Sequence, residues 1–229
     1  MKLQFILPIV GTLFVIAAAP AQGAVLFADD FEDGTLDAWH IDGRQLQGTN
    51  IANVVTHNSS QMGHVYKTGF SEVWFETNYA YDANLRFEFD MEANASSPTG
   101  SNSNIYADAG AYFAFVDQND TVLGWTAYLR TTSTWPLVQF DTPIHSYNTI
   151  ADDAMHSYDI GFPELLANNP GINPADVASV KFLFRGYASG SSSDLQAEVF
   201  VDNVVVTPEP STGVALFLGT LLALRRRHT

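Results

Sequence analysis

The chain has 229 residues, a formal net charge of −15 and no cysteine. This acidic balance argues against nucleic acid or an anionic lipid surface as a partner, because like charges repel. The lack of cysteine excludes disulfides and thiolate metal sites, so a folded domain must depend on its own apolar core.

The first 24 residues have the order of a secretory signal peptide. Lys2 supplies a positive start, Leu3 to Ala19 is uncharged and mostly apolar, and small residues up to Ala24 offer cleavage positions. A segment of this kind directs export and is removed by signal peptidase. We therefore assign residues 1–24 to a signal peptide and residues 25–207, with a formal charge of −18, to the folded domain.

The middle of the domain has the periodicity of β-strands. In Arg86 to Glu92, apolar and charged side chains alternate, which predicts a strand with one buried and one solvated face. Ala111 to Val116 and Val122 to Leu129 flank the polar turn at residues 117–120, which predicts a hairpin. Two further strong strands are expected at Ser179 to Arg185 and Glu198 to Val206.

Weaker strand patterns and a few helix signals complete the domain. The weaker strands are expected at Val25 to Phe27, Val54 to His57, His64 to Lys67, Val73 to Thr77, Leu137 to Phe140 and Ser157 to Ile160. Asn173 before Pro174 is a helix-start signal, and Phe162 to Asn168 is a second short helical candidate. About ten short strands with turn-like spacing predict an all-β fold, a jelly-roll β-sandwich.

Two segments near the ends of the domain resemble carbohydrate-binding-module-like jelly rolls. The opening turn reads DDFEDG at residues 29–34 and is followed by Trp39, and the last strand reads VFVDNVVV at residues 199–206. In many such modules the first and last strands pair and share a structural calcium ion. The resemblance therefore implies Glu32 and Asp202 as Ca²⁺ ligands, with Asp30 as a further candidate; alternatively, these carboxylates form a solvated acidic turn.

One strand carries an enzyme-like pattern. Glu88, Asp90 and Glu92 share one face of a strand and resemble the catalytic strand of laminarinase- and lichenase-type glycoside hydrolases. The resemblance implies Glu88 as nucleophile and Glu92 as acid/base, with Asp90 tuning their protonation. Alternating acids are also the ordinary solvated face of an acidic protein, and Arg86 continues that face. We expect no enzyme, with the hydrolase as the alternative.

Aromatic residues supply a second possible ligand site. Trp125, Tyr128 and Trp135 lie in or after the second hairpin strand, next to the polar run at residues 131–134. Flat rings with a polar tip can stack against sugars, so these three are candidate ligand-binding residues. The alternative is core packing, which we expect for Trp39 and Trp74.

The C-terminal segment, residues 208–229, has three parts. Pro208, Glu209 and Pro210 precede an apolar run to Leu224, which is followed by three basic residues, Arg225, Arg226 and Arg227. As a helix, residues 211–224 would rise about 21 Å, which is short for a bilayer core of about 30 Å. The arginines can reach the headgroups and favour the cytoplasmic side.

This tripartite tail resembles the PEP-CTERM sorting tail of exported bacterial proteins. The resemblance implies that the C-terminal helix anchors the protein transiently in the inner membrane. It also implies that an exosortase then recognises the Pro-Glu-Pro motif. Together these features predict an exported, non-enzymatic β-sandwich at the cell surface or in the extracellular matrix, adhesive or polysaccharide-binding. The alternatives are the glycoside hydrolase and a purely structural matrix component.

Overall fold

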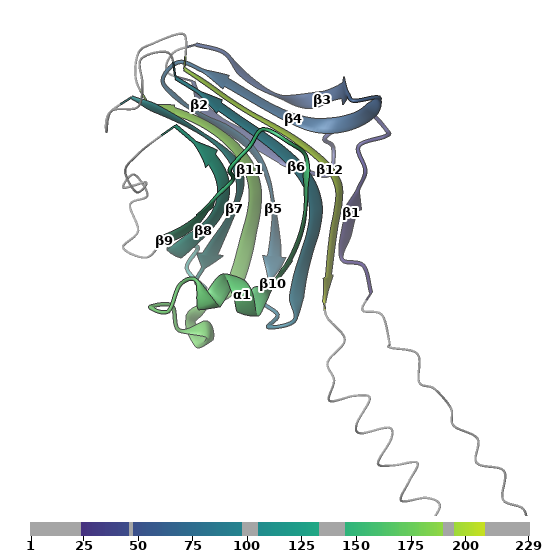
Figure 1. Cartoon of the computed structure of the whole chain (residues 1–229). Helices are drawn as coiled ribbons and strands as arrows, with labels where there is room; N and C mark the ends of the chain where they lie inside the picture. Colours follow the sequence, from purple (N-terminus) through teal and green to yellow (C-terminus); the bar gives the residue numbers. More distant parts are fainter. Residues whose placement is uncertain (1–23, 46–47, 98–104, 133–144, 190–194, 209–229) are drawn as a thin grey trace, which may run out of the picture. The chain divides into compact units, whose positions relative to one another are not determined.

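The computed structural model describes residues 24–45, 48–97, 105–132, 145–189 and 195–208. These residues form twelve strands, one short α-helix and one 3-10 turn, and the strands lie in two six-stranded sheets (Figure 1). The predicted all-β sandwich is confirmed. The assigned signal peptide up to residue 23 and the tail after Pro208 lie outside the described residues.

The first sheet, here called sheet A, is antiparallel throughout. Its order is β10 (His156–Gly161), β6 (Leu85–Ser96), β12 (Gln196–Pro208), β4 (Ser60–Thr68) and β3 (Asn50–His57), and β1 (Phe27–Asp29) also pairs with β12. The first half of β12 pairs with β4 and its last part pairs with β1. The register against β6 shifts between Asp202 and Val205, so a bulge marks this exchange of partners.

Sheet B runs in the order β2 (His40–Gln45), β5 (Ser71–Ala80), β11 (Ser179–Ser189), β7 (Tyr106–Val116), β8 (Val122–Thr131) and β9 (His145–Thr149). Its strands are antiparallel except for β8 and β9, which are parallel. The predicted hairpin is confirmed as β7 and β8. In the turn between them, the Asp117 carboxylate accepts hydrogen bonds from the backbone N–H groups of Asn119 and Thr121 at 2.8 Å each.

The core lies between the two sheets and follows from the alternation in β6. Phe87, Phe89 and Met91 point inward and are at most 2% exposed, as the sequence predicts. Phe89 meets Phe182 and Phe184 of β11 at ring-centroid distances of 5.3 and 5.4 Å. Burial of each such ring contributes about 1.5–3 kcal/mol, which compensates for the absence of disulfides.

The acidic turn after β1 is held by local hydrogen bonds. The Asp29 carboxylate accepts the backbone N–H of Phe31 at 2.8 Å and the indole N–H of Trp39 at 2.7 Å. Phe31 is fully buried at a positive φ of 57°, and its ring lies over Gly63 of β4. A Cβ at Gly63 would come within 2.8 Å of the Phe31 ring, so this strand position requires glycine.

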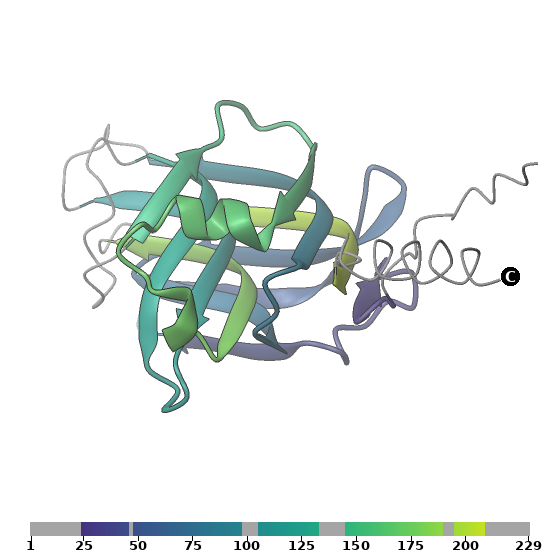
Figure 2. The same cartoon turned by 90° about the horizontal axis from the view of Figure 1, so that it is seen from below.

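The helix signals are confirmed, with α1 at Phe162–Ala167 and the 3-10 turn at Pro174–Asp176. The Asn173 side chain caps the turn by accepting the N–H of Ala175. Figure 2 shows α1 across one end of the sandwich, where Phe162 and Leu165 enter the core. Within the described ranges, no helix combines the length and apolar character needed to cross a membrane. The expected apolar tail segment lies outside those ranges.

Two strands and one tryptophan differ from the sequence expectations. The polar segments that form β2 and β9 were not expected to be strands, while the expected strand at residues 137–140 lies outside the described residues. Trp74 was expected in the core, which is wrong. It lies half-buried on the outer face of sheet B, where it packs against a second apolar cluster.

Candidate functional site

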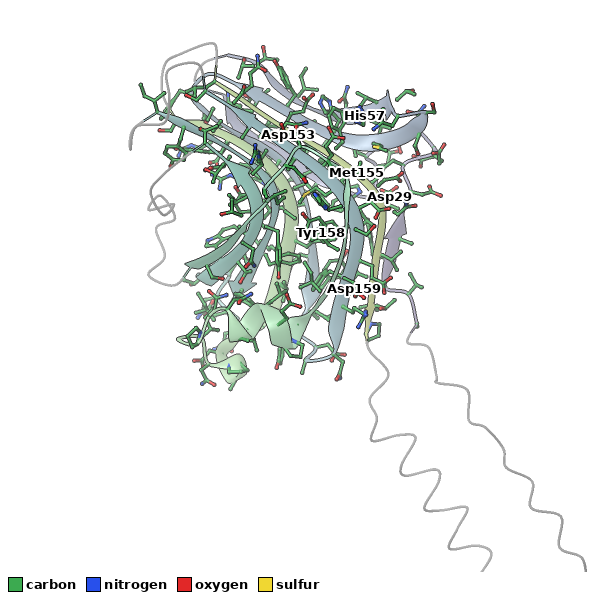
Figure 3. The ribbon with its side chains drawn as sticks, in the orientation of Figure 1. Asp29, His57, Asp153, Met155, Tyr158 and Asp159 are labelled. Carbon is green, nitrogen blue, oxygen red and sulfur yellow. The ribbon has the colours of Figure 1, made fainter. Side chains whose placement is uncertain are left out.

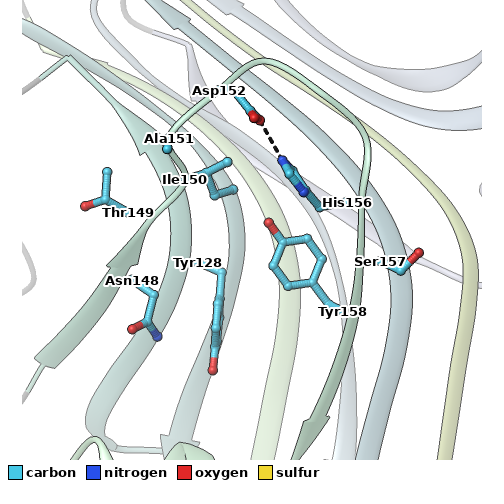
Figure 4. A pocket seen from close by; sticks show the side chains of 9 residues that line it. All are labelled: Tyr128, Asn148, Thr149, Ile150, Ala151, Asp152, His156, Ser157 and Tyr158. Atoms are coloured by element: carbon cyan, nitrogen blue, oxygen red, sulfur yellow. Dashed lines mark hydrogen bonds and ion pairs between the residues drawn. The ribbon is translucent and has the colours of Figure 1, made fainter.

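The candidate site is a pocket of about 270 Å³ at the side of the sandwich (Figure 4). It lies where β9, an edge strand of sheet B, faces β10, an edge strand of sheet A. Strand β8 and the connection from β9 to β10 complete its wall. The lining residues are mostly polar or aromatic: Tyr128, Asn148, Thr149, Ile150, Ala151, Asp152, His156, Ser157 and Tyr158.

Two tyrosines supply the aromatic part of the pocket. Tyr158 of β10 stacks on the core residue Phe89, with ring centroids 4.9 Å apart and an interplanar angle of 13°. The rings of Tyr128 and Tyr158 meet edge to face, with centroids 5.8 Å apart. The Tyr128 hydroxyl donates a hydrogen bond to the Glu164 carboxylate of α1 at 2.8 Å. Burial raises the pKa of Tyr158 to about 12 and raises that of Tyr128 as well, so both phenols keep their protons at neutral pH.

The connection between β9 and β10 is pinned by Arg130 of β8. The guanidinium donates to the carbonyls of Ile150 and Ala151 at 3.2 and 2.9 Å, and its Nε pairs with Asp153 at 2.9 Å. Asp153, Met155, Tyr158 and Asp159 follow one another from this connection into β10 (Figure 3). The wall of the pocket therefore depends on one half-buried arginine that contacts Ile150, Ala151 and Asp153.

The charged part of the pocket is the pair formed by Asp152 and His156. Their side chains meet at 2.6 Å, the contact drawn as a dashed line in Figure 4. This hydrogen bond and the backbone N–H of Ala154 lower the pKa of Asp152, so the group is a carboxylate over the neutral range. The pocket thus combines a fixed negative charge with neutral donors and acceptors.

The expected sugar-stacking residues do not form one platform. Tyr128 lines the pocket, whereas Trp125 lies half-buried on the outer face of sheet B. The two residues are three positions apart, and side chains at odd spacing in a strand point to opposite faces. Trp135 lies outside the described residues.

Sequence reasoning missed Tyr158 and His156, which belong to a strand that was only weakly indicated. Both residues line the pocket because β10 lies at the edge of sheet A, opposite β9. A signal was present in the sequence, since an aspartate stands four residues before the histidine. It could not indicate that an edge of the other sheet would face this pair.

The carboxylates of the hydrolase alternative share one outer face of sheet A, as their spacing predicts. Each is engaged by a different neighbour: Glu88 pairs with Arg86 at 3.5 Å, Asp90 accepts from Asn203 at 2.8 Å, and Glu92 contacts His57 at 3.0 Å. None of the three is among the described residues that line the pocket. This arrangement does not assemble an acid and a nucleophile around a common cavity.

The carboxylates expected to bind calcium do come together. The Ser60 hydroxyl contacts Glu32 at 2.9 Å and Asp202 at 3.1 Å, so the two carboxylate oxygens are at most about 6 Å apart. Burial raises the pKa of Asp202, and the neighbouring Asp90 and Glu32 raise it further, a repulsion that a cation would relieve.

The donor set at Ser60 fits calcium in type but only partly in number. Carboxylate and hydroxyl oxygens are the ligands that this ion prefers. Across the described residues, however, no group of three or more histidine or acidic side chains is placed to hold a metal. Asp30 instead accepts the backbone N–H of Glu32 at 3.3 Å and so stabilises the turn.

A second polar cluster lies on the outer face of sheet B. Arg185 forms an ion pair with Glu72 and lies over the rings of Tyr112 and Tyr187, at 5.3 and 4.8 Å. Nearby Asp108 is only 1% exposed, and burial raises its pKa to about 7. This face is therefore packed, and its central rings are not available as an open stacking surface.

Comparison with known proteins gives distant structural likenesses. No family model matches the chain, and no curated protein matches it. One similar structure comes from work on the promiscuous specificity of carbohydrate-binding modules of the β-sandwich superfamily. It is 16% identical with a TM-score of 0.44, and the match covers 80% of this chain and 62% of that one, less than two thirds of its length.

Two further similar structures cover nearly all of their own chains. The family 11 carbohydrate-binding module from Clostridium thermocellum, solved with a β-1,3-1,4-mixed-linked tetrasaccharide, is 15% identical with a TM-score of 0.44 and covers 83% of this chain and 97% of that one. A cleaved adhesin domain of Lys-gingipain from Porphyromonas gingivalis is 14% identical with a TM-score of 0.40, covering 80% and 99%. At this distance the likeness assigns no ligand to this chain.

Proposed function

We propose that this protein is an exported, non-catalytic β-sandwich that binds carbohydrate at the cell surface or in the extracellular matrix. The observation that carries the proposal is the pocket between β9 and β10. There two tyrosine rings lie beside amide, hydroxyl, imidazole and carboxylate groups. Saccharides present ring faces that stack on aromatic side chains and hydroxyls that need both donors and acceptors.

Neutral polar residues make up much of this recognition surface. Asn148 and Thr149 offer short side chains that both donate and accept hydrogen bonds, whereas the Ser157 hydroxyl already donates to Asp90. The protonated phenol of Tyr158 adds a donor beside the rings, whereas the Tyr128 hydroxyl already donates to Glu164. A site that can satisfy hydroxyl groups discriminates strongly against ligands that lack them, because its own polar groups would be left unpaired.

The binding proposal is tested with a glycan array followed by titration calorimetry on protein purified after export. Asn148→Ala removes an exposed pocket amide and should weaken binding about tenfold, a typical loss for one ligand hydrogen bond. Asn78→Ala is the matched control, since Asn78 is exposed on β5 in the same sheet and does not line the pocket. An equal loss of affinity in both variants, or no binding to any glycan on the array, would count against a sugar site in this pocket. Either result would favour a structural matrix role.

The sorting part of the proposal rests on the tail sequence. We expect Pro208, Glu209 and Pro210 to be needed for release from the inner membrane by an exosortase. Replacing all three by alanine should leave the exported protein in the membrane fraction, whereas the unaltered chain reaches the surface or matrix. Replacing Arg225, Arg226 and Arg227 should instead reduce correct anchoring. Identical fractionation of all three chains would contradict the sorting mechanism.

A further inference from the structure

We infer that the pocket between β9 and β10 selects saccharides by charge, binding the terminal ring of a glycan that carries an amino group and disfavouring uronate and sulfated glycans. This inference rests on the proposed function. It names the class of ligand for the same pocket, from the charges that surround it and from its size.

The pocket presents a carboxylate with an oxygen available to a ligand. Among the described residues, both hydrogen bonds to the Asp152 carboxylate, from His156 and from the N–H of Ala154, end on Oδ1. The other oxygen can therefore accept from a ligand ammonium group. A charge-assisted hydrogen bond of this type is about twice as strong as one between neutral groups.

The basic groups around the pocket already have acidic or carbonyl partners. Arg130 is bound to Asp153 and to two backbone carbonyls, and His156 is bound to Asp152. Glu164 adds a further carboxylate at the Tyr128 hydroxyl. An anionic sugar would meet basic groups that already have acidic or carbonyl partners, whereas an amino sugar would add a cation beside the second oxygen of Asp152.

The field of the whole domain acts in the same direction. Residues 25–207 carry a formal charge of −18, which attracts cationic ligands and repels anionic ones. The pocket of about 270 Å³ is smaller than the roughly 300–1,000 Å³ of ordinary small-molecule sites. It therefore suits one end of a glycan rather than an internal stretch of several rings.

The test compares three oligosaccharides of equal length by titration calorimetry: a glucosamine oligomer, its fully N-acetylated form and a galacturonate oligomer. All are measured at one pH at which the amine is protonated. We expect the amine to bind about tenfold more tightly than the acetylated form, and the uronate to bind more weakly than both. Added salt should reduce the difference, because the attraction is screened.

Asp152→Asn should abolish the preference for the amine. The glucosamine oligomer and its N-acetylated form should then bind with similar affinity. Asp37→Asn makes the same change in net charge at an exposed position before β2, at the opposite edge of sheet B from β9, and should retain the preference. Equal or tighter binding of the uronate, or the same preference in both variants, would overturn the charge selection alone. No binding of any of the three would overturn the proposed function, and this inference with it.

Discussion

Asp108 is a carboxylic acid held almost wholly out of water on the outer face of sheet B. Tyr106 and Tyr112 from its own strand, Arg185 from β11 and Thr131 from β8 surround it. Burial raises its pKa to about 7, well above the ordinary value of 3.8. A group of this kind links the stability of the whole sandwich to pH.

Asp108 makes the folded protein less stable as pH rises. Because the folded-state pKa is raised, the folded protein binds more protons than the unfolded chain between about pH 4 and pH 7. The free energy of unfolding should therefore fall as pH rises through this window. Asp108→Asn should flatten the dependence and raise stability at alkaline pH by up to about 4 kcal/mol, at about 1.36 kcal/mol per pKa unit.

Urea unfolding at several pH values checks this prediction. Asp37→Asn, an exposed aspartate, provides the control and should keep the slope of the unaltered protein. A slope that persists in Asp108→Asn would mean that another group dominates the pH dependence.

Gly63 is a second residue whose identity is set by packing. Because a Cβ there would lie 2.8 Å from the ring of Phe31, Gly63→Ala should force the ring or the strand to move. Such overpacking costs about 1–3 kcal/mol. A thermal unfolding curve checks it, and an unchanged midpoint would show that Phe31 has room to shift.

At the scale of elements, the connection from β9 to β10 joins the two sheets and forms the pocket wall. Its fixed points are the backbone hydrogen bond from Ile150 to Leu129 at 2.7 Å and the contacts of Arg130. Because residues 151–154 are exposed and Ile150 is the buried residue of this connection, its opening should cost much less free energy than global unfolding.

Arg130→Gln should release this connection without unfolding the sandwich. We expect faster amide exchange at residues 150–156 and weaker saccharide binding. The loss of global stability should stay below about 1 kcal/mol, because Asp153 is exposed and its ion pair is screened by water. Lys181→Gln, which removes a comparable surface pair with Asp120, is the control and should leave exchange at the connection unchanged. Faster amide exchange throughout both sheets would instead show that Arg130 is needed for the stability of the whole sandwich.

At the scale of the whole molecule, a strongly acidic domain without disulfides can gain stability from a cation. If Glu32 and Asp202 hold calcium, Ca²⁺ at one hundred times its dissociation constant should add about 2.7 kcal/mol of stability. EDTA should reverse the gain, and Asp202→Asn should remove the response. Asp176→Asn, an exposed change in the 3-10 turn, should retain it. An identical melting midpoint with Ca²⁺ and with EDTA would exclude a stabilising ion.

Local patterns carried much of the fold prediction. The alternation in Arg86 to Glu92 specified which face of β6 is buried. The Asn173 cap and the Asp117 turn depend on hydrogen bonds to residues only a few positions away in the sequence. The edge strands β2 and β9 were missed because their sequences are polar. An edge strand needs only one paired neighbour and little burial, so its composition gives a weak signal.

The sequence by itself determined the β class, the core face of the central strands, the acidity of the domain and the apolar character of both ends of the chain. Tertiary structure decided which side chains meet: Tyr128 of β8 and Tyr158 of β10 between the two sheets, Glu32 and Asp202 around one hydroxyl, and Trp125 away from both. Periodicity is a property of neighbours along the chain. Strand order is settled by burial and pairing between residues far apart, which no local pattern encodes.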